Sequence, residues 1–140
     1  MLFKRLNRND AERVFSVFKA NAAGIAADDV VSLETNSASI DGVNIIQPVA
    51  AQLGLVVGVA DAAIANGAYG LVQIYGYRST SRVVQTTSSI PAGAGLVAVA
   101  AADYLDSVTA SAFGHYFHIL ESVPANTLLT VSRKIFIRCM

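Results

Sequence analysis

The sequence predicts a mainly β protein: a small β-barrel or a sandwich with a short N-terminal helix or arm. About seven short apolar runs are separated by turns rich in Gly, Ser and Asn, which is typical of all-β domains. Only one segment, near the N-terminus, has helical periodicity. The length of 140 residues suits one domain, which we divide into an arm over residues 1–25 and a β-domain over residues 26–140.

The arm is predicted to contain an amphipathic helix over residues 11–20. Asn9 or Asp10 is a suitable N-cap. The apolar stripe of this helix consists of Val14, Phe15, Val17 and Phe18. A helix of about ten residues is marginal alone in water, so it has to dock. Docking on its own β-domain and docking on a neighbouring subunit stay open as alternatives.

A central hairpin organises the β-domain. Its strands are expected over Leu53–Ala60 and Tyr69–Tyr77, and Asn66-Gly67 supplies the turn signal between them. Nothing in this stretch is a nucleophile, a metal ligand or a phosphate cradle in its context. The hairpin therefore indicates a protein that works by shape and contact.

The remaining strands are assigned from short apolar or β-branched runs. They are expected over Val30–Glu34, Val43–Gln47, Leu96–Ala101, Tyr116–Leu120 and Leu128–Arg138. A short helix is the alternative for Leu96–Ala101, residues 78–87 are a strand or an extended connection, and residues 103–114 are a polar connection. A faint internal echo places Val57–Asn66 on Phe117–Asn126. We interpret the echo as two similar β-units.

The composition indicates that part of the surface meets other protein chains. Charged residues make up 14% of the chain, against about 25% in typical domains. With 54% apolar residues, there is too little charge to cover an isolated sphere well. We expect a homo-oligomer, dimer or trimer, with a tight alanine-rich monomer as the alternative. The two ends are basic and the middle is acidic, which suits contacts between subunits.

The sequence offers no convincing metal or redox site. Cys139 is the only cysteine, so an intramolecular disulfide is excluded. His115 and His118 lie at the start of a predicted strand, which directs them to opposite faces. Asp103 and Asp106 lack the EF-hand spacing and its closing Glu. We therefore expect no metal and no cofactor.

Catalytic, nucleic-acid and membrane functions are also disfavoured. The segment Pro91–Gly95 is glycine-rich but lacks a phosphate-loop ending, and no serine lies in a nucleophile elbow. The basic residues are too few for a nucleic-acid footprint. The longest apolar run, Ile90–Ala102, is too short and too rich in Gly and Pro to span a membrane. We expect that the protein is not an enzyme.

Three segments carry a resemblance to a known class of protein. These are Leu55–Ala60, Tyr69–Gly76 and Ser89–Val97, which read as a "GVA…YGxVQxxG" hairpin followed by an "I-x-A-G-x-x-L" loop and strand. The pattern covers about residues 53–100. It resembles the capsid decoration, or cement, proteins of tailed bacteriophages.

The resemblance implies a compact β-barrel or β-tulip-like domain, often trimeric, on the capsid exterior of a virion assembled in the host cytoplasm. The implied partner is the major capsid protein, and no catalytic residues carry over. The arm would bridge neighbouring capsid subunits. Its expected partner-binding residues are Phe3, Lys4, Arg5, Leu6, Arg8, Phe15 and Phe18. Alternatives are another virion component (tail, connector or spike base) or a glycan-binding β-module, although the chain has no Trp for sugar stacking.

Overall fold

A computed structural model describes residues 12–21, 23–35, 42–84, 89–107, 116–124 and 131–139. Within these ranges the chain forms one eleven-stranded sheet and one short 3-10 helix, which confirms the mainly β prediction. The elements are β1 (Arg13–Ala20), β2 (Val30–Leu33), β3 (Asn44–Ile46), η1 (Ala50–Leu55), β4 (Val56–Ala60), β5 (Tyr69–Arg78), β6 (Arg82–Val83), β7 (Gly95–Ala98), β8 (Leu105–Ser107), β9 (Phe117–Ile119), β10 (Val131–Ser132) and β11 (Ile135–Arg138).

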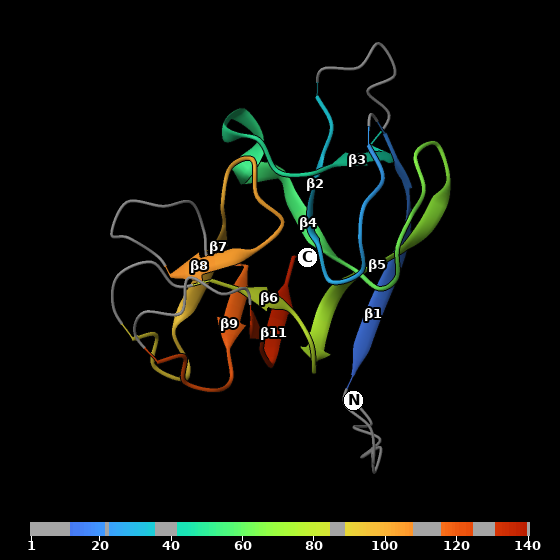
Figure 1. The fold of residues 1–140 in the computed structure, drawn as a ribbon. Coiled ribbons are helices and arrows are strands. Elements are labelled where there is room, and N and C mark those ends of the chain that lie inside the picture. Colours follow the sequence, from blue (N-terminus) through green and yellow to red (C-terminus); the bar gives the residue numbers. More distant parts are fainter. Residues whose placement is uncertain are drawn as a thin grey trace, which may run out of the picture.

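The first five strands form a closed barrel, which we call the first unit. Their order is β1-β3-β2-β4-β5, and β1 also pairs with β5, which closes the ring. The predicted central hairpin is confirmed, because β4 and β5 are antiparallel neighbours. The strand itself begins at Val56, after the 3-10 turn. Figure 1 shows this unit in blue to green.

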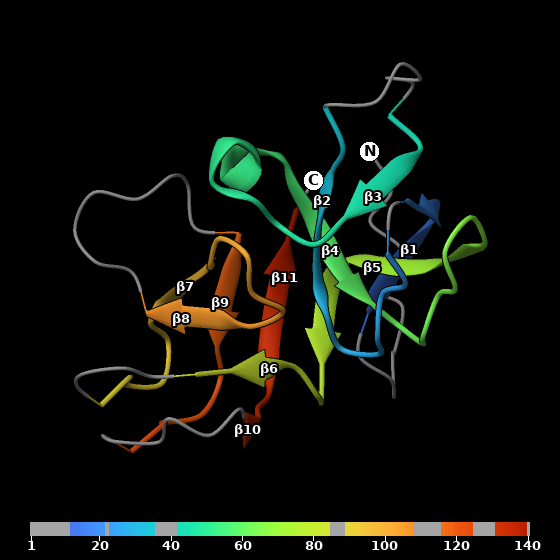
Figure 2. The same ribbon diagram turned by 45° about the horizontal axis from the view of Figure 1, so that its top comes forward.

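The other six strands, the second unit, repeat this arrangement. The complete order is β1-β3-β2-β4-β5-β11-β9-β7-β8-β6-β10, so the second half mirrors the first. The parallel β1–β3 pair corresponds to the parallel β6–β8 pair. In the second unit, two short strands take the place of the long strand β5. β10 pairs with β6 as β5 pairs with β1, and β11 pairs with β9 as β5 pairs with β4. The two units lie side by side in Figures 1 and 2 and join where β5 pairs with β11.

The strand registers of the two units agree residue by residue. In the first unit Val31 lies opposite Gly58, and in the second unit Leu96 lies opposite Phe117. The turns that precede β2 and β7 match too, because each has a residue with positive φ at the same place. Those residues are Asp28 (φ 68°) and Gly93 (φ 86°). The two similar β-units inferred from the internal echo are therefore real.

The sequence alignment that suggested the two units, Val57–Asn66 on Phe117–Asn126, is one residue out of register. It matched Val59 with Ile119, whereas the hydrogen bonds match Ala60 with Ile119. The amide of Ala60 donates to the Asp29 carbonyl oxygen (2.9 Å), and the amide of Ile119 donates to that of Ala94 (3.0 Å). In a strand, an error of one residue exchanges the inward and outward faces.

Each unit has its own core, and the cores correspond. Every buried member of the smaller core has a counterpart at the equivalent position in the larger core. The pairs are Ala20 and Val83, Ile25 and Ile90, Val31 and Leu96, Ile45 and Leu105, Ala60 and Ile119, Ile64 and Val123, and Val72 and Ile135. The larger core also holds residues such as Val30 and Val59 from the first unit. Apolar packing thus joins the two units into one body.

The helix predicted over residues 11–20 is wrong, because Arg13–Ala20 form strand β1. The apolar residues of this segment fit a helical stripe and a two-residue alternation almost equally well. Pairing with β5 from Arg13 to Lys19 decides in favour of the strand, as tertiary hydrogen bonding overrides weak local propensity. Residues 1–11 lie outside the described residues, so the arm itself stays a prediction.

The other strand predictions are confirmed with small shifts, except in the polar connection over residues 103–114. That segment contains β8, which pairs with β7. The run Leu128–Arg138 is divided into β10 and β11. Among the described residues, no helix has the length and apolarity needed to cross a membrane.

Candidate interaction surface

The outer surface of the first unit carries a cluster of exposed apolar side chains on two paired strands. Phe15 and Val17 on β1 are 36% and 57% exposed, and Tyr69 and Leu71 on β5 are 65% and 48% exposed. Val17 lies directly opposite Leu71. Because cross-strand neighbours lie about 5 Å apart, their side chains form a continuous patch. We call these four residues the β1/β5 face.

Alternation along β1 places this face outside the barrel. Arg13, Phe15 and Val17 are exposed, whereas Val14, Ser16 and Phe18 between them are half-buried. Phe18 packs against the smaller core. The side chains of the β1/β5 face point to the other side of their strands, away from this core.

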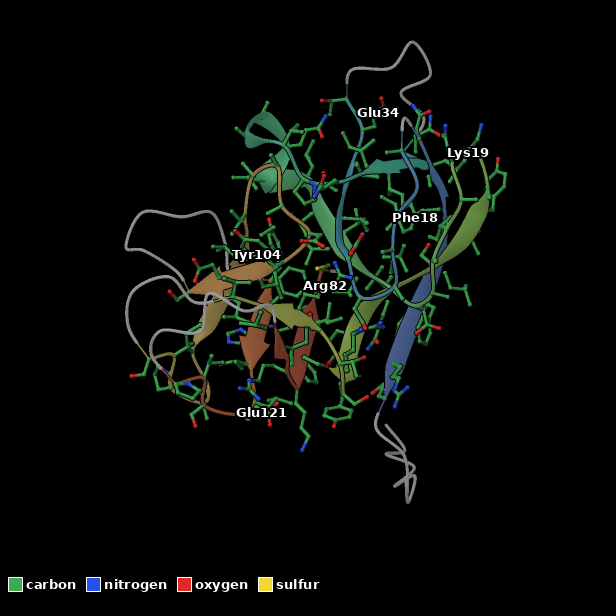
Figure 3. All side chains as sticks on the ribbon, in the orientation of Figure 1. Phe18, Lys19, Glu34, Arg82, Tyr104 and Glu121 are labelled. Atoms are coloured by element: carbon green, nitrogen blue, oxygen red, sulfur yellow. The ribbon has the colours of Figure 1, made fainter. Side chains whose placement is uncertain are left out.

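Cations border the β1/β5 face at both ends of β1. Arg13 is exposed at the start of the strand and Lys19 is half-buried near its end. Lys19 lies opposite Tyr69, and Figure 3 shows Lys19 at the outer margin of the first unit. Among the described residues, neither cation forms an ion pair with a carboxylate.

The predicted partner-binding residues are only partly described. Phe15 belongs to the β1/β5 face, whereas Phe18 lies against the smaller core. The other predicted residues, Phe3, Lys4, Arg5, Leu6 and Arg8, lie outside the described residues. The sequence predicts Tyr69 and Leu71 in the hairpin, without indicating a binding surface there. Their alternation with Gly70 and the buried Val72 was the signal that places them outward.

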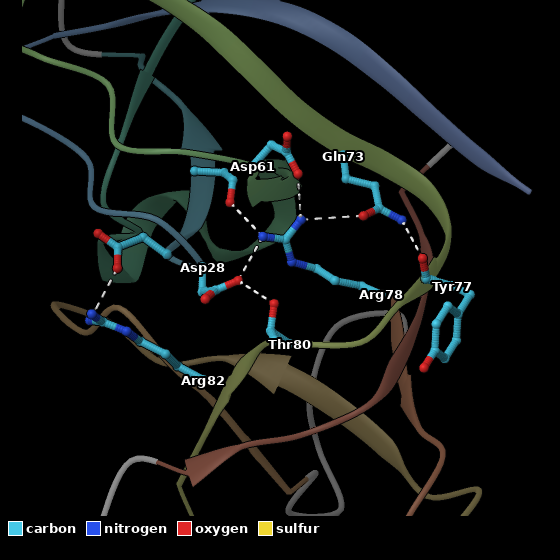
Figure 4. A network of polar contacts seen from close by, with 9 residues as sticks. Asp28, Asp61, Gln73, Tyr77, Arg78, Thr80 and Arg82 are labelled. Atoms are coloured by element: carbon cyan, nitrogen blue, oxygen red, sulfur yellow. Dashed lines mark hydrogen bonds and ion pairs between the residues drawn. The ribbon is translucent and has the colours of Figure 1, made fainter. Parts of the chain in front are cut away.

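A buried arginine ties together elements of the first unit next to the junction between the two units. Arg78, at the end of β5, is 6% exposed. Its Nη2 donates to Asp28 Oδ1 (2.6 Å) and to the Ala60 carbonyl oxygen (2.9 Å), and its Nη1 donates to Asp61 Oδ1 and Gln73 Oε1 (3.3 Å each). Figure 4 shows the guanidinium at the centre of these partners. A planar fork of donors suits several acceptors at once.

A second arginine links the units more openly. Arg82 on β6 pairs with Asp29 from the first unit through Nη1 and Oδ1 (3.2 Å), and with Asp103 from the second unit. Burial raises the pKa of the Asp29 carboxyl above its usual value, while the Ala26 amide and Arg82 lower it. Arg82 therefore links the two units, whereas the side chain of Arg78 contacts residues of the first unit.

A polar hollow lies beside the first unit, and its charged side chains are engaged in polar contacts. It has a volume of about 430 Å³ and is partly lined by Asn21, Asp29, Glu34 and Asp103. The Asn21 amide donates to Glu34, and Arg82 pairs with both aspartates. Within the described part of the chain, no group of three or more His, Cys, Asp or Glu side chains is placed to hold a metal ion.

No protein family model and no curated protein sequence matches this chain. Among solved structures, it is similar to the crystal structure of the N base of head fibre protein gp8.5 from bacteriophage phi29. The two chains are 13% identical, the match covers 91% of this chain and 96% of that one, and the TM-score is 0.52. Sequence identity this low supports a conclusion about architecture alone. The chain thus shares its fold with the base of a phage head fibre.

Proposed function

We propose that this chain is a virion structural protein that binds the outside of a phage capsid and stabilises it by bridging neighbouring subunits. The observation that carries the proposal is an exposed apolar face on a fold shared with a head fibre base. A surface of this kind gains free energy when another protein covers it. The protein acts by contact, without catalysis and without a cofactor.

The proposed stabilisation follows from mass action. A protein that binds only the mature shell lowers the free energy of that state, and the effect is multiplied over many copies. A specific, stable contact buries more than about 1,000 Å² in total. The β1/β5 face alone is too small for this, so we propose that residues 1–11 and a second copy of the chain contribute further contact area.

The proposed role of the arm rests on its residue types. Phe3 and Leu6 would supply apolar anchors, and Lys4, Arg5 and Arg8 would meet an acidic shell surface. Because β1 begins at Arg13 and is part of the barrel, the arm to be tested ends at residue 11.

A second candidate function is the base of a head fibre. The similarity to the gp8.5 N base favours it. Such a base would also sit on the head, but it would carry a projecting fibre and occupy selected positions. Electron cryomicroscopy of virions separates the two candidates, because only a fibre base is continuous with density that extends away from the shell.

Cosedimentation with purified shells tests the proposed function. We expect the full-length protein to bind mature shells and to bind immature shells at least about tenfold more weakly, since expansion creates the site. Deletion of residues 1–11 is expected to weaken binding by a similar factor. Equal binding by the full-length and deleted proteins would refute the arm, and no binding to any shell would refute the proposed function.

A further inference from the structure

The internal repeat allows the β1/β5 face to be compared with the same place on the second unit. Pairing identifies the counterparts: Ser132 lies opposite Arg82 as Tyr69 lies opposite Lys19. The Arg133 amide donates to the Ser81 carbonyl oxygen (2.9 Å), which extends the same register. The positions of Val17, Tyr69 and Leu71 are therefore taken by Thr80, Ser132 and Lys134, and all three counterparts are exposed.

The fold itself does not require apolar residues at these positions. The second unit has the same strand order and an equivalent core, yet its outer surface there is polar. Lys19 corresponds to Arg82, but Arg82 is paired with Asp29 and Asp103. Phe15 corresponds to the buried Arg78, so the comparison of exposed side chains rests on the other three positions of the face. Solvent-exposed apolar residues gain nothing in an isolated molecule, so their presence on one unit only points to a partner.

We propose that the β1/β5 face of the first unit is a docking surface for an apolar protein surface bordered by carboxylates. The carboxylates would pair with Arg13 and Lys19, which have no carboxylate partner among the described residues. The partner surface is taken to belong to a capsid subunit, and in this respect the inference rests on the proposed function. The matching surface of the second unit, around Thr80 and Lys134, would remain in solvent.

A second copy of the same face is a poorer occupant. Two such faces in contact would bring the cations at the ends of β1 close to one another, and the four residues of the β1/β5 face include no carboxylate to compensate. Like charges placed together across an interface are destabilising. A different protein with carboxylates around its apolar surface avoids this repulsion, and both Arg13 and Lys19 can then form ion pairs across the interface.

The decisive variant transplants the residues of the second unit onto the first. We would make V17T/Y69S/L71K and measure binding to mature shells by cosedimentation. Because the equivalent positions already carry these residues on the same strand arrangement, the variant is expected to fold with an unchanged melting temperature. Leu120→Lys is the matched control, since Leu120 is also exposed (45%) but lies outside the face. If the triple variant fails to fold, the single change Leu71→Lys replaces it.

We expect the triple variant to bind at least about tenfold more weakly, and the Leu120→Lys variant to bind like the unchanged protein. Arg13→Glu with Lys19→Glu should also weaken binding about tenfold, whereas Arg13→Lys should not. A folded triple variant that binds as well as the unchanged protein would overturn the docking surface but leave the proposed function standing. Self-association lost in the triple variant would overturn it in favour of a second copy.

Discussion

At the scale of single residues, the part of the first unit next to the junction depends on Arg78. Its buried guanidinium joins the turn before β2, the residue after β4 and the middle of β5 through Asp28, Asp61 and Gln73. Thr80 donates to the same Asp28 oxygen (2.9 Å), so the linker between the units is tied into the network as well. Without the guanidinium, Gln73 Oε1 and the Ala60 carbonyl oxygen would lose a buried donor, and the two partly exposed aspartates would lose their cation. Loss of one partner from such a network costs more than the network contributes in net stability.

Replacement of Arg78 should destabilise the protein strongly. We expect Arg78→Ala to lower the free energy of unfolding by about 2–4 kcal/mol, and Arg78→Lys to recover only part of the loss, because an ammonium cannot reproduce the fork. Urea denaturation measures both. Arg138→Ala, at an exposed arginine, is the control and should change stability by less than about 0.5 kcal/mol. A similarly small effect at Arg78 would contradict a structural role for the network.

The buried thiol of Cys139 makes the stability of the fold depend on pH in the alkaline range. Burial against the larger core raises the pKa of its thiol from 9.0 to about 12. Between these values the unfolded chain loses the thiol proton and the folded protein keeps it. The free energy of unfolding therefore falls as pH rises above about 9, by up to about 1.4 kcal/mol per pH unit.

Comparison of the unchanged protein with Cys139→Ala isolates this contribution. Stability measured from pH 8 to pH 10.5 should fall more steeply for the unchanged protein, because alanine has no proton to lose. Other groups that titrate in this range affect both proteins equally. If the free energy of unfolding depends on pH in the same way for both proteins, the pKa of the thiol is not raised in the folded state.

At the scale of elements, the start of β1 approaches the backbone of β5 very closely at a glycine. Gly76 has φ +100°, and a Cβ there would overlap the carbonyl oxygen of Glu12. The register between β1 and β5 shifts close by, between Val14 and Phe15. A bulge of this kind bends a strand and increases its twist, which lets β1 close the barrel while β5 continues to β11.

Gly76→Ala should therefore destabilise the protein by about 3 kcal/mol or more, because the backbone conformation and the contact are both unfavourable. Gly67→Ala is the matched control: Gly67 also has positive φ (+76°), but a Cβ there would meet open space. Its cost should stay near 1 kcal/mol. Thermal or urea unfolding of the two variants tests the difference, and equal losses would mean that the close approach is unimportant.

The elements could be predicted where the apolar pattern was unambiguous. The β4–β5 hairpin follows from its apolar runs and the Asn-Gly turn. The segment of β1 was misjudged because a Val-Phe-Ser-Val-Phe run suits either period, and only long-range pairing distinguishes them. Strand β8 was missed because Asp106 and Ser107 make it look like a polar loop. The β1/β5 face depended on both pairings and could not be assembled from local pattern alone.

At the scale of the whole molecule, the chain is two copies of one unit with different surfaces. The repeat was almost invisible in the sequence, since identical residues such as Ile25 and Ile90 are rare among the counterparts. Only apolar character and strand register are kept, because a core requires volume and polarity more than identity. Tyr75 lies opposite Arg138, its own counterpart, so an approximate two-fold axis passes between β5 and β11.

Under the proposed docking of the first unit on a shell, this arrangement would fix the orientation of the whole protein. The cores and the junction hold the two units as one body, so contact through the first unit determines where the second unit points. The apolar β1/β5 face should be covered, and the polar surface around Thr80 and Lys134 should face solvent. Bridging neighbouring capsid subunits then requires contacts on either side of the covered face.

Electron cryomicroscopy of purified virions tests the central claim most directly. We expect density for this fold on the outer surface of the head, with β1 and β5 against capsid subunits and β6 and β10 outward. Density with the second unit against the shell, or virions that lack this chain altogether, would contradict the account.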